Sequence, residues 1–318
     1  MFPKTKNNMR IKTSICLLSL SLGLLTARTF AGNEFASSSS NGSTASNGDD
    51  PLSYEFDAEE TYVGGGDVER GFRHIDDVDE NNALVRFIFT PRIRIGILRL
   101  GAGFERYDFN IPRAAEIPDS LQSATLIVGL DTQFSDSILV RFEAQPGFYG
   151  TDFDNFGSGD FNVPFILGGT YIWNSSVQIV LGVGVDLEGK YPVLPGGGVR
   201  WKLAPQWVLN AVLPKPRLEF EVNKDLTLYA GAEVKSSNYR VDDHFGDDRG
   251  IPRLNHAVIA YSEVRTGAGL DWKLSSMAKL SIEGGYLPYR VFDYHRTDVR
   301  YHSDGGAPYG MVGLHMAF

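Results

Sequence analysis

Two acidic, histidine-containing stretches are the parts of this sequence whose residue types could do chemistry. VDDHFGDDRG contains Asp242, Asp243, His244, Asp247 and Asp248, and DYHRTDVRYHSDGG contains Asp293, His295, Asp298, His302 and Asp304. Carboxylates and imidazoles at close spacing can bind a divalent cation or act as a general acid and base. Neither stretch has a defined ligand spacing, and charge-rich loops are common, so we assign no metal, cofactor or catalytic site to them.

Two further motifs also fall short of a chemical site. TDFDNFGSGD has Asp152 and Asp154 at the spacing of a calcium loop, but Phe156 occupies the next ligand position and no Glu closes the loop. His315 could partner a serine in acyl hydrolysis, yet the sequence contains no Gly-x-Ser-x-Gly nucleophile motif. We therefore predict that the chain is not an enzyme.

The C-terminal segment alternates strictly. Val312, Leu314, Met316 and Phe318 occupy one set of positions, and small residues and His315 occupy the other. A period of two places the two sets on opposite faces of a strand. A last strand that ends on Phe is typical of bacterial outer-membrane barrels, so we predict that these four residues form the signal recognised by the assembly machinery.

The N-terminal segment has the features of a secretory signal peptide. Its first twelve residues contain Lys4, Lys6, Arg10 and Lys12 and no acid, and an apolar stretch and small residues up to Ala31 follow. The apolar stretch is too short to span a bilayer. We predict a signal peptide over residues 1–31 and a flexible Ser/Asn/Gly-rich periplasmic linker over residues 32–52.

Composition excludes several classes of function. The single cysteine, Cys16, lies within the predicted signal peptide, so the exported chain would have no disulfide, thiol nucleophile or cysteine metal site. The formal charge is −9, and removal of five basic residues with the signal peptide would bring it to −14. So acidic a chain is a poor nucleic-acid binder.

From residue 53 onward the sequence divides into short alternating segments, as in strands with one face in lipid. In residues 136–147, for example, Ile138, Val140 and Phe142 alternate with Arg141 and Glu143. We predict about fourteen strands, over 53–63, 82–90, 94–107, 122–134, 136–147, 162–173, 176–187, 194–203, 206–213, 216–223, 225–236, 255–273, 277–293 and 308–318. Without the short pair 206–213 and 216–223 there would be twelve. A change of apolar phase near Gly96 predicts a bulge there.

The connections between these segments alternate in length. Short ones are predicted near Pro91 and at 135–136, 174–175, 204–205, 223–224 and 275–276, and longer ones at 65–81, 108–121, 148–161, 188–193, 237–254 and 294–307, with 214–216 as a short exception. Outer-membrane barrels have short periplasmic turns and longer external loops. Residues 53–318 are therefore predicted to form an all-β, antiparallel up-and-down transmembrane β-barrel in the bacterial outer membrane.

The two faces of the predicted strands differ in chemistry. Aromatic residues such as Tyr171, Trp173, Trp201, Trp207 and Trp272 lie on the lipid-facing set near short turns, which suits the membrane boundary. The inward set carries charges of both signs, which must be hydrated or paired. The residues predicted to line a lumen are Arg141, Glu143, Arg200, Lys202, Glu263 and Arg265. An aqueous pore and a salt-bridge network that closes the lumen both remain open.

Part of the C-terminal half resembles a known family. The blocks LPGGGVRWKLAPQWVLNAVLPKPRLEFEVNKDLTLYAGAEV (194–234), RTGAGLDWKL (265–274) and GGYLPYRVFDY (284–294) are similar to uncharacterised bacterial outer-membrane β-barrel domains, which resemble small porin-like proteins. The resemblance implies the fold and the location and no catalytic residue or substrate.

Three hypotheses for function follow from these patterns. The first is a passive outer-membrane channel for small solutes, with outer-membrane lipid and the assembly machinery as its other partners. The second is a non-conducting structural or surface-binding barrel that displays acidic external loops, and the third, least favoured, is a barrel hydrolase.

Overall fold

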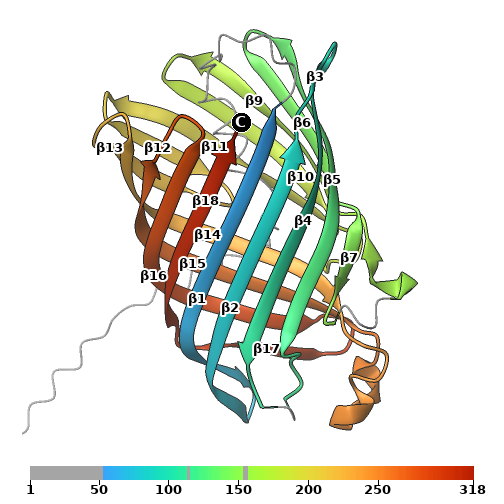
Figure 1. Ribbon diagram of the computed structural model, residues 1–318. Helices are drawn as coiled ribbons and strands as arrows, with labels where there is room; N and C mark the ends of the chain where they lie inside the picture. Colours follow the sequence, from blue (N-terminus) through green and yellow to red (C-terminus); the bar gives the residue numbers. More distant parts are fainter. Residues whose placement is uncertain (1–52, 113–114, 153–156) are drawn as a thin grey trace, which may run out of the picture.

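Fourteen antiparallel strands form the wall of a closed barrel (Figure 1). The computed structural model describes residues 53–112, 115–152 and 157–318. The predicted signal peptide (1–31) and linker (32–52) lie outside the described residues. Each wall strand pairs with the next one along the chain, so the up-and-down topology is as predicted.

The elements differ strongly in length around the wall. The wall strands are β1 (Tyr54–Arg70), β2 (Arg73–Phe89), β4 (Gly96–Asn110), β5 (Ser120–Ser135), β6 (Ile138–Ala144), β9 (Phe165–Asn174), β10 (Val177–Val185), β11 (Val193–Ala204), β12 (Trp207–Val212), β13 (Arg217–Glu221), β14 (Leu226–Arg240), β15 (Val258–Lys273), β16 (Ala278–Tyr294) and β18 (Ala307–Ala317). Shorter strands are β3 (Arg92–Ile93), β7 (Gly147–Gly150), β8 (Phe161–Asn162) and β17 (Val299–Asp304). Three 3-10 turns are η1 (Ser158–Asp160), η2 (Asp247–Arg249) and η3 (Pro252–Leu254), and no helix in the described part of the chain is long and apolar enough to cross a membrane.

The last strand closes the barrel against the first. β18 pairs with β1 from Ala317, opposite Glu55, to Tyr309, opposite Val63. Phe318 extends the ladder, because its amide donates to the carbonyl of Tyr54 at 3.0 Å. The prediction of fourteen strands is confirmed. The twelve-strand alternative is wrong, because β12 and β13 form a hairpin that pairs with β11 on one side and β14 on the other.

The two faces of the wall are as the alternation predicts. On β6, Phe142 faces outward and is 41% exposed, whereas its neighbours Arg141 and Glu143 face inward and are buried. All four tryptophans of the chain, at positions 173, 201, 207 and 272, are exposed on strands next to short turns. The outer surface is therefore a continuous apolar band with tryptophans toward one end.

The barrel has a wide end and a narrow end. At one end of the barrel, which we call the short-turn end, the connections between wall strands are short. The longer connections lie at the other end, which we call the long-loop end (Figure 1). Six wall strands, β6 and β9 to β13, separate β5 from β14 at the short-turn end. At the long-loop end β7 pairs with β5 and its Gly150 also bridges to Arg240 of β14. At the long-loop end, where the short strands have ended, β7 therefore links β5 to β14 and the barrel is narrower.

Two sequence predictions in the first part of the barrel are wrong, the loop at 65–81 and the bulge near Gly96. The predicted loop 65–81 is a β-hairpin, in which β1 and β2 continue to a turn at residues 71–72. Its side chains are polar on the exposed face, so the apolar alternation used to find strands is missing there. The short turn predicted near Pro91 lies at residues 94–95, and it reverses the chain just before Gly96, so no strand bulge is needed there to change the apolar phase.

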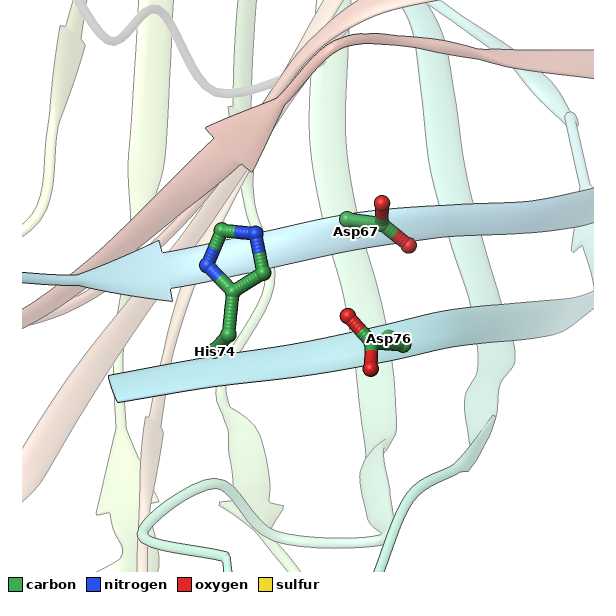
Figure 2. Close-up of side chains that lie close together, drawn as sticks. All are labelled: Asp67, His74 and Asp76. Atoms are coloured by element: carbon green, nitrogen blue, oxygen red, sulfur yellow. The ribbon is translucent and has the colours of Figure 1, made fainter. Parts of the chain in front are cut away.

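The hairpin of β1 and β2 lies at the long-loop end (Figure 1). β17 pairs with β1 along it, which makes a three-stranded ribbon. Val68, Ile75 and Tyr301 on the inner face of the ribbon are buried in the barrel core. On its other face, Asp67 from β1 faces His74 and Asp76 from β2 (Figure 2).

We expect charge on the outer face to be costly only at mid-height. Leu181 lies in the middle of β10 and is 68% exposed. We expect Leu181→Arg to reduce the folding free energy of the barrel by about 2–4 kcal/mol, because the cation would enter hydrocarbon. Leu203→Arg, next to a short turn, should cost about 0–1 kcal/mol. Folding titrations in lipid vesicles measure both, and equal losses would contradict the assigned membrane depth.

Candidate functional site

The inner face of β1 carries a ladder of acidic side chains. Glu55, Asp57 and Glu59 alternate with outward residues and are followed by the buried Thr61. Each of these acids, which we call a rung of the ladder, contacts a basic group from a different strand. The acidic composition of this segment therefore reflects a strand whose inward-facing positions are charged.

The first rung lies at the short-turn end. Glu55 pairs with Arg99 of β4 at 3.0 Å, and Arg99 also bonds Glu143 of β6 at 3.2 Å. Arg141, on β6, pairs with Asp131 of β5 at 2.6 Å. Arg99, Arg141 and Glu143 are each less than 5% exposed. In the next rung, Asp57 Oδ1 lies 2.6 Å from His315 Nδ1.

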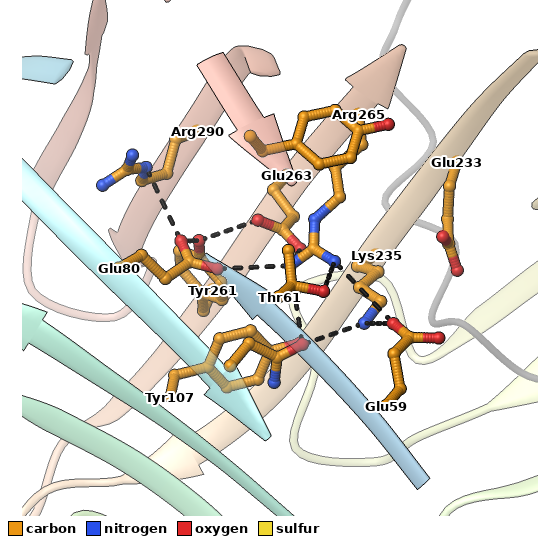
Figure 3. A network of polar contacts seen from close by, with 12 residues as sticks. Glu59, Thr61, Glu80, Tyr107, Glu233, Lys235, Tyr261, Glu263, Arg265 and Arg290 are labelled. Carbon is orange, nitrogen blue, oxygen red and sulfur yellow. Dashed lines mark hydrogen bonds and ion pairs between the residues drawn. The ribbon is translucent and has the colours of Figure 1, made fainter. Parts of the chain in front are cut away.

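The central rungs reach across the interior (Figure 3). Lys235 of β14 lies 3.5 Å from Glu59 of β1, although β1 and β14 are not neighbours in the wall. Arg265 of β15 donates to Thr61 of β1 at 3.0 Å and pairs with Glu80 of β2 at 3.3 Å. These contacts join strands that two or three other wall strands separate, so side chains extend across the interior at this level.

The central network is completed by groups that share its acids. Arg265 also pairs with Glu263 at 2.8 Å, Arg290 lies 3.8 Å from Glu80, and the Tyr261 hydroxyl donates to Glu80. All five side chains are almost fully buried. Buried charges are tolerated only when paired and hydrogen bonded, and removal of one partner leaves the others uncompensated. The network therefore holds the strands around it in one arrangement.

An aromatic cluster fills the interior between this network and the long-loop end. Tyr107 and Phe109 of β4 meet Tyr261 of β15 with ring centroids 5.0 and 5.3 Å apart, and Phe109 meets Phe292 of β16 at 5.1 Å. β4 and β15 are separated by four strands along one side of the wall and by eight along the other. Rings in contact between such strands leave no passage between them. Residues of the 241–257 connection, including Phe245 and Leu254, are also part of this core.

The short-turn end remains accessible to water. Arg200 and Glu219 pair at 3.6 Å with side chains 19% and 17% exposed. Arg217 and Asp271 pair at 3.7 Å, and the His315 side chain is 40% exposed. The interior is thus hydrated at its wide end and dry at its narrow end.

The structure separates the six predicted lumen residues into groups. Arg141 and Glu143 belong to the cluster at the short-turn end, and Glu263 and Arg265 belong to the central network. Arg200 is half-buried beside Glu219, and Lys202 is exposed. Their inward placement follows from the alternation. Whether they line a conducting pore stays a prediction.

The two histidine-containing stretches do not come together as one site. His244 is 85% exposed and lies 3.6 Å from Asp247, and His256 pairs with Asp243 at 2.7 Å. Partial burial raises the pKa of the Asp242 carboxyl, against a hydrogen bond from Thr151. Burial and the neighbouring Arg296 lower the pKa of His295.

Sequence reasoning missed several functional groups. It did not find Glu59, Glu80 and Arg290 of the central network. Glu80 fell within the predicted loop 65–81, whereas Glu59 and Arg290 fell within predicted strands (53–63 and 277–293), but their partners come from strands distant in sequence. The aromatic cluster was missed as well. Tyr261 is in phase with Glu263 and Arg265, and Phe292 is in phase with Arg290, so this phase could have marked both rings as inward.

Comparisons with known proteins give a likeness of fold. No family model and no curated protein matches the chain. The chain is similar to an outer membrane channel from Pseudomonas putida F1, at 8% identity over 86% of this chain and 99% of that chain with a TM-score of 0.48. A FadL homologue from Pseudomonas aeruginosa is similar at 9% identity over 85% of this chain and 90% of that chain, with a TM-score of 0.40. The strand pairing itself establishes the closed barrel.

Removal of the central cation should destabilise the barrel. Arg265→Met leaves Glu80 and Glu263 buried without their main partner, so we expect a loss of about 3–5 kcal/mol of folding free energy. Lys224→Met removes an 89% exposed cation that lies 4.0 Å from Asp225, and should change the free energy by less than about 1 kcal/mol. Denaturant titrations in detergent micelles compare the two, and similar losses would show that the network adds no stability.

Proposed function

We propose that this chain is a porin-like outer-membrane β-barrel that is closed across its long-loop half and does not conduct in the conformation described. The observation that carries the proposal is the contact of Tyr107 with Tyr261, backed by Arg265 and its acids, across the interior. Passage of a solute would require these rings to separate and the buried charges to lose their partners. Both steps cost free energy.

The outer surface supports the membrane location. Large apolar side chains such as Leu126, Phe142 and Leu181 are 41–68% exposed all around the wall. A soluble protein rarely exposes so large an apolar surface, whereas a barrel in lipid requires it. With the usual orientation, the short-turn end faces the periplasm and the long-loop end faces outside. Outer-membrane lipid and, through residues 312–318, the assembly machinery are the proposed partners.

A passive channel for small solutes is the second candidate, and one observation favours it. Charged inner-face groups at the wide end, including Arg200, Glu219 and His315, stay accessible to water. A solute could enter this part of the interior from the periplasm. Conduction would then be limited by the central network and the aromatic cluster, which together would act as a gate.

The two candidates differ in their conductance. Untagged protein, purified in detergent from the membranes of a Gram-negative expression host, is inserted into planar bilayers and recorded at low voltage. We expect no steps from the native protein. The double variant Tyr107→Ala, Tyr261→Ala removes the rings that meet across the interior and should give discrete steps.

The matched control is Tyr171→Ala, which removes an outward ring that is 45% exposed and should leave the barrel silent. Heat-dependent gel mobility verifies that each protein is folded. Regular steps from the native protein would overturn the closed barrel and establish the passive channel. Silence from a folded double variant would show that the rings are not the barrier.

A further inference from the structure

The outward face of the three-stranded ribbon at the long-loop end gathers metal-ligating side chains. We call this set the ribbon patch. Its members come from β1, β2 and β17 and are Asp67, Glu69, His74, Asp76, His302 and Asp304. None of them belongs to the interior network or to the aromatic cluster.

The strand register places these residues on one face. Glu69 of β1 lies opposite His74 of β2 and opposite His302 of β17, so the three form a row across the ribbon. Asp67 lies opposite Asp304 and begins a second row. Side chains directly opposite on antiparallel strands have Cβ atoms about 4.5–5.5 Å apart. Because the strands hold the residues in place, the patch does not depend on a flexible loop.

The side-chain atoms lie close together, although Glu69 faces His74 Nδ1 and Asp304 faces the other ring nitrogen, Nε2, so both carboxylates reach one ion only after a side-chain movement. Glu69 Oε1 is 3.3 Å from His302 Nε2, and its Oε2 is 3.6 Å from His74 Nδ1. His74 Nε2 is 3.3 Å from Asp304 Oδ2. Glu69, His74 and Asp304 can each offer one atom so that all three atoms lie within 4.8 Å of one another, and the same holds for Asp67, His74 and Asp76 (Figure 2). Ligand atoms about 2.0–2.1 Å from a tetrahedral ion lie about 3.3 Å apart.

The patch has an excess of negative charge. Four of its members are carboxylates, and every ion pair that they make within the described residues is to His74 or His302. The nearby Arg70 and Arg73 do not offset it, because both pair with Glu116 on the other side of the ribbon. The His74 and Asp304 side chains are 46% and 53% exposed, so an ion from the medium can reach them.

We propose that the ribbon patch binds a divalent transition-metal ion of the Zn²⁺ class. His74, Glu69 and Asp304 are the ligands, and His302 is the fourth through a small movement of its side chain. Imidazole ligands favour Zn²⁺, Ni²⁺ and Cu²⁺ over Mg²⁺ and Ca²⁺, which prefer oxygen. The ion would tie β17 to the hairpin of β1 and β2 on the side opposite the barrel core.

The competing arrangement is a set of ion pairs between protonated histidines and carboxylates. It needs no metal and gives the same distances. The two arrangements differ in one respect, because only the first takes up a metal ion, which binds neutral imidazoles. Metal uptake at neutral pH therefore separates them.

The test is equilibrium dialysis of untagged, detergent-purified protein against Zn²⁺ at pH 7.4, with Ca²⁺ in a parallel cell. We expect about one Zn²⁺ per chain and at least tenfold weaker uptake of Ca²⁺ at the same concentration. His74→Gln and His302→Gln should each weaken the affinity for Zn²⁺ by at least tenfold.

His244→Gln is the matched control, because His244 lies in another connection and is 85% exposed. It should bind Zn²⁺ as the native protein does, and heat-dependent gel mobility should show that all variants are folded. Three results would overturn the proposal: no uptake of Zn²⁺, uptake unchanged in His74→Gln, or Ca²⁺ bound as tightly as Zn²⁺. The first would favour simple ion pairs, and the last would favour a site made of carboxylates alone.

Discussion

The inward-facing, partly buried acids of β1 impose the constraint on which the rest of this barrel depends. A strand that turns Glu55, Asp57 and Glu59 toward the interior requires a basic group or water at each level. Arg99 reaches the first acid from two strands away, and Lys235 reaches the third from β14, which three wall strands separate from β1. Such reach is possible only where the interior is narrow. The ion pairs across the interior therefore require a barrel of small diameter at that level.

The shape of the molecule follows from this link. Long strands β1, β2, β4, β5 and β14 to β16 extend beyond the short strands β6 and β9 to β13, and the wall closes on itself where β7 bridges β5 and β14. The interior changes along its length from hydrated charges through buried ion pairs to packed rings. A wide barrel could not bring Tyr107 to Tyr261. The narrowing that satisfies the charges thus also brings the aromatic rings into contact.

The alternation of apolar and polar residues was sufficient to predict the strands of the wall. It was insufficient to predict the side-chain contacts inside the barrel. Every wall strand includes part of a predicted segment, because a lipid-facing side must be apolar at every second residue, as in β6 and β10. The polar ribbon could not be found this way, since neither lipid nor a continuous apolar face shapes residues 65–81. The partners of Arg265 and of His74 come from strands distant in sequence. Period-two patterns give the face of a residue but not which distant strand lies across from it.

The central claim, that side chains close the interior, is tested most directly by chemical access to Thr61. This residue is fully buried at the central network, and the only native cysteine of the 318-residue sequence is Cys16. Thr61→Cys and His315→Cys proteins in lipid vesicles are treated with a membrane-impermeant maleimide, with denatured protein as the full-labelling reference. The closed barrel predicts labelling at position 315 and none at position 61. Rapid labelling at position 61 in folded protein would contradict it.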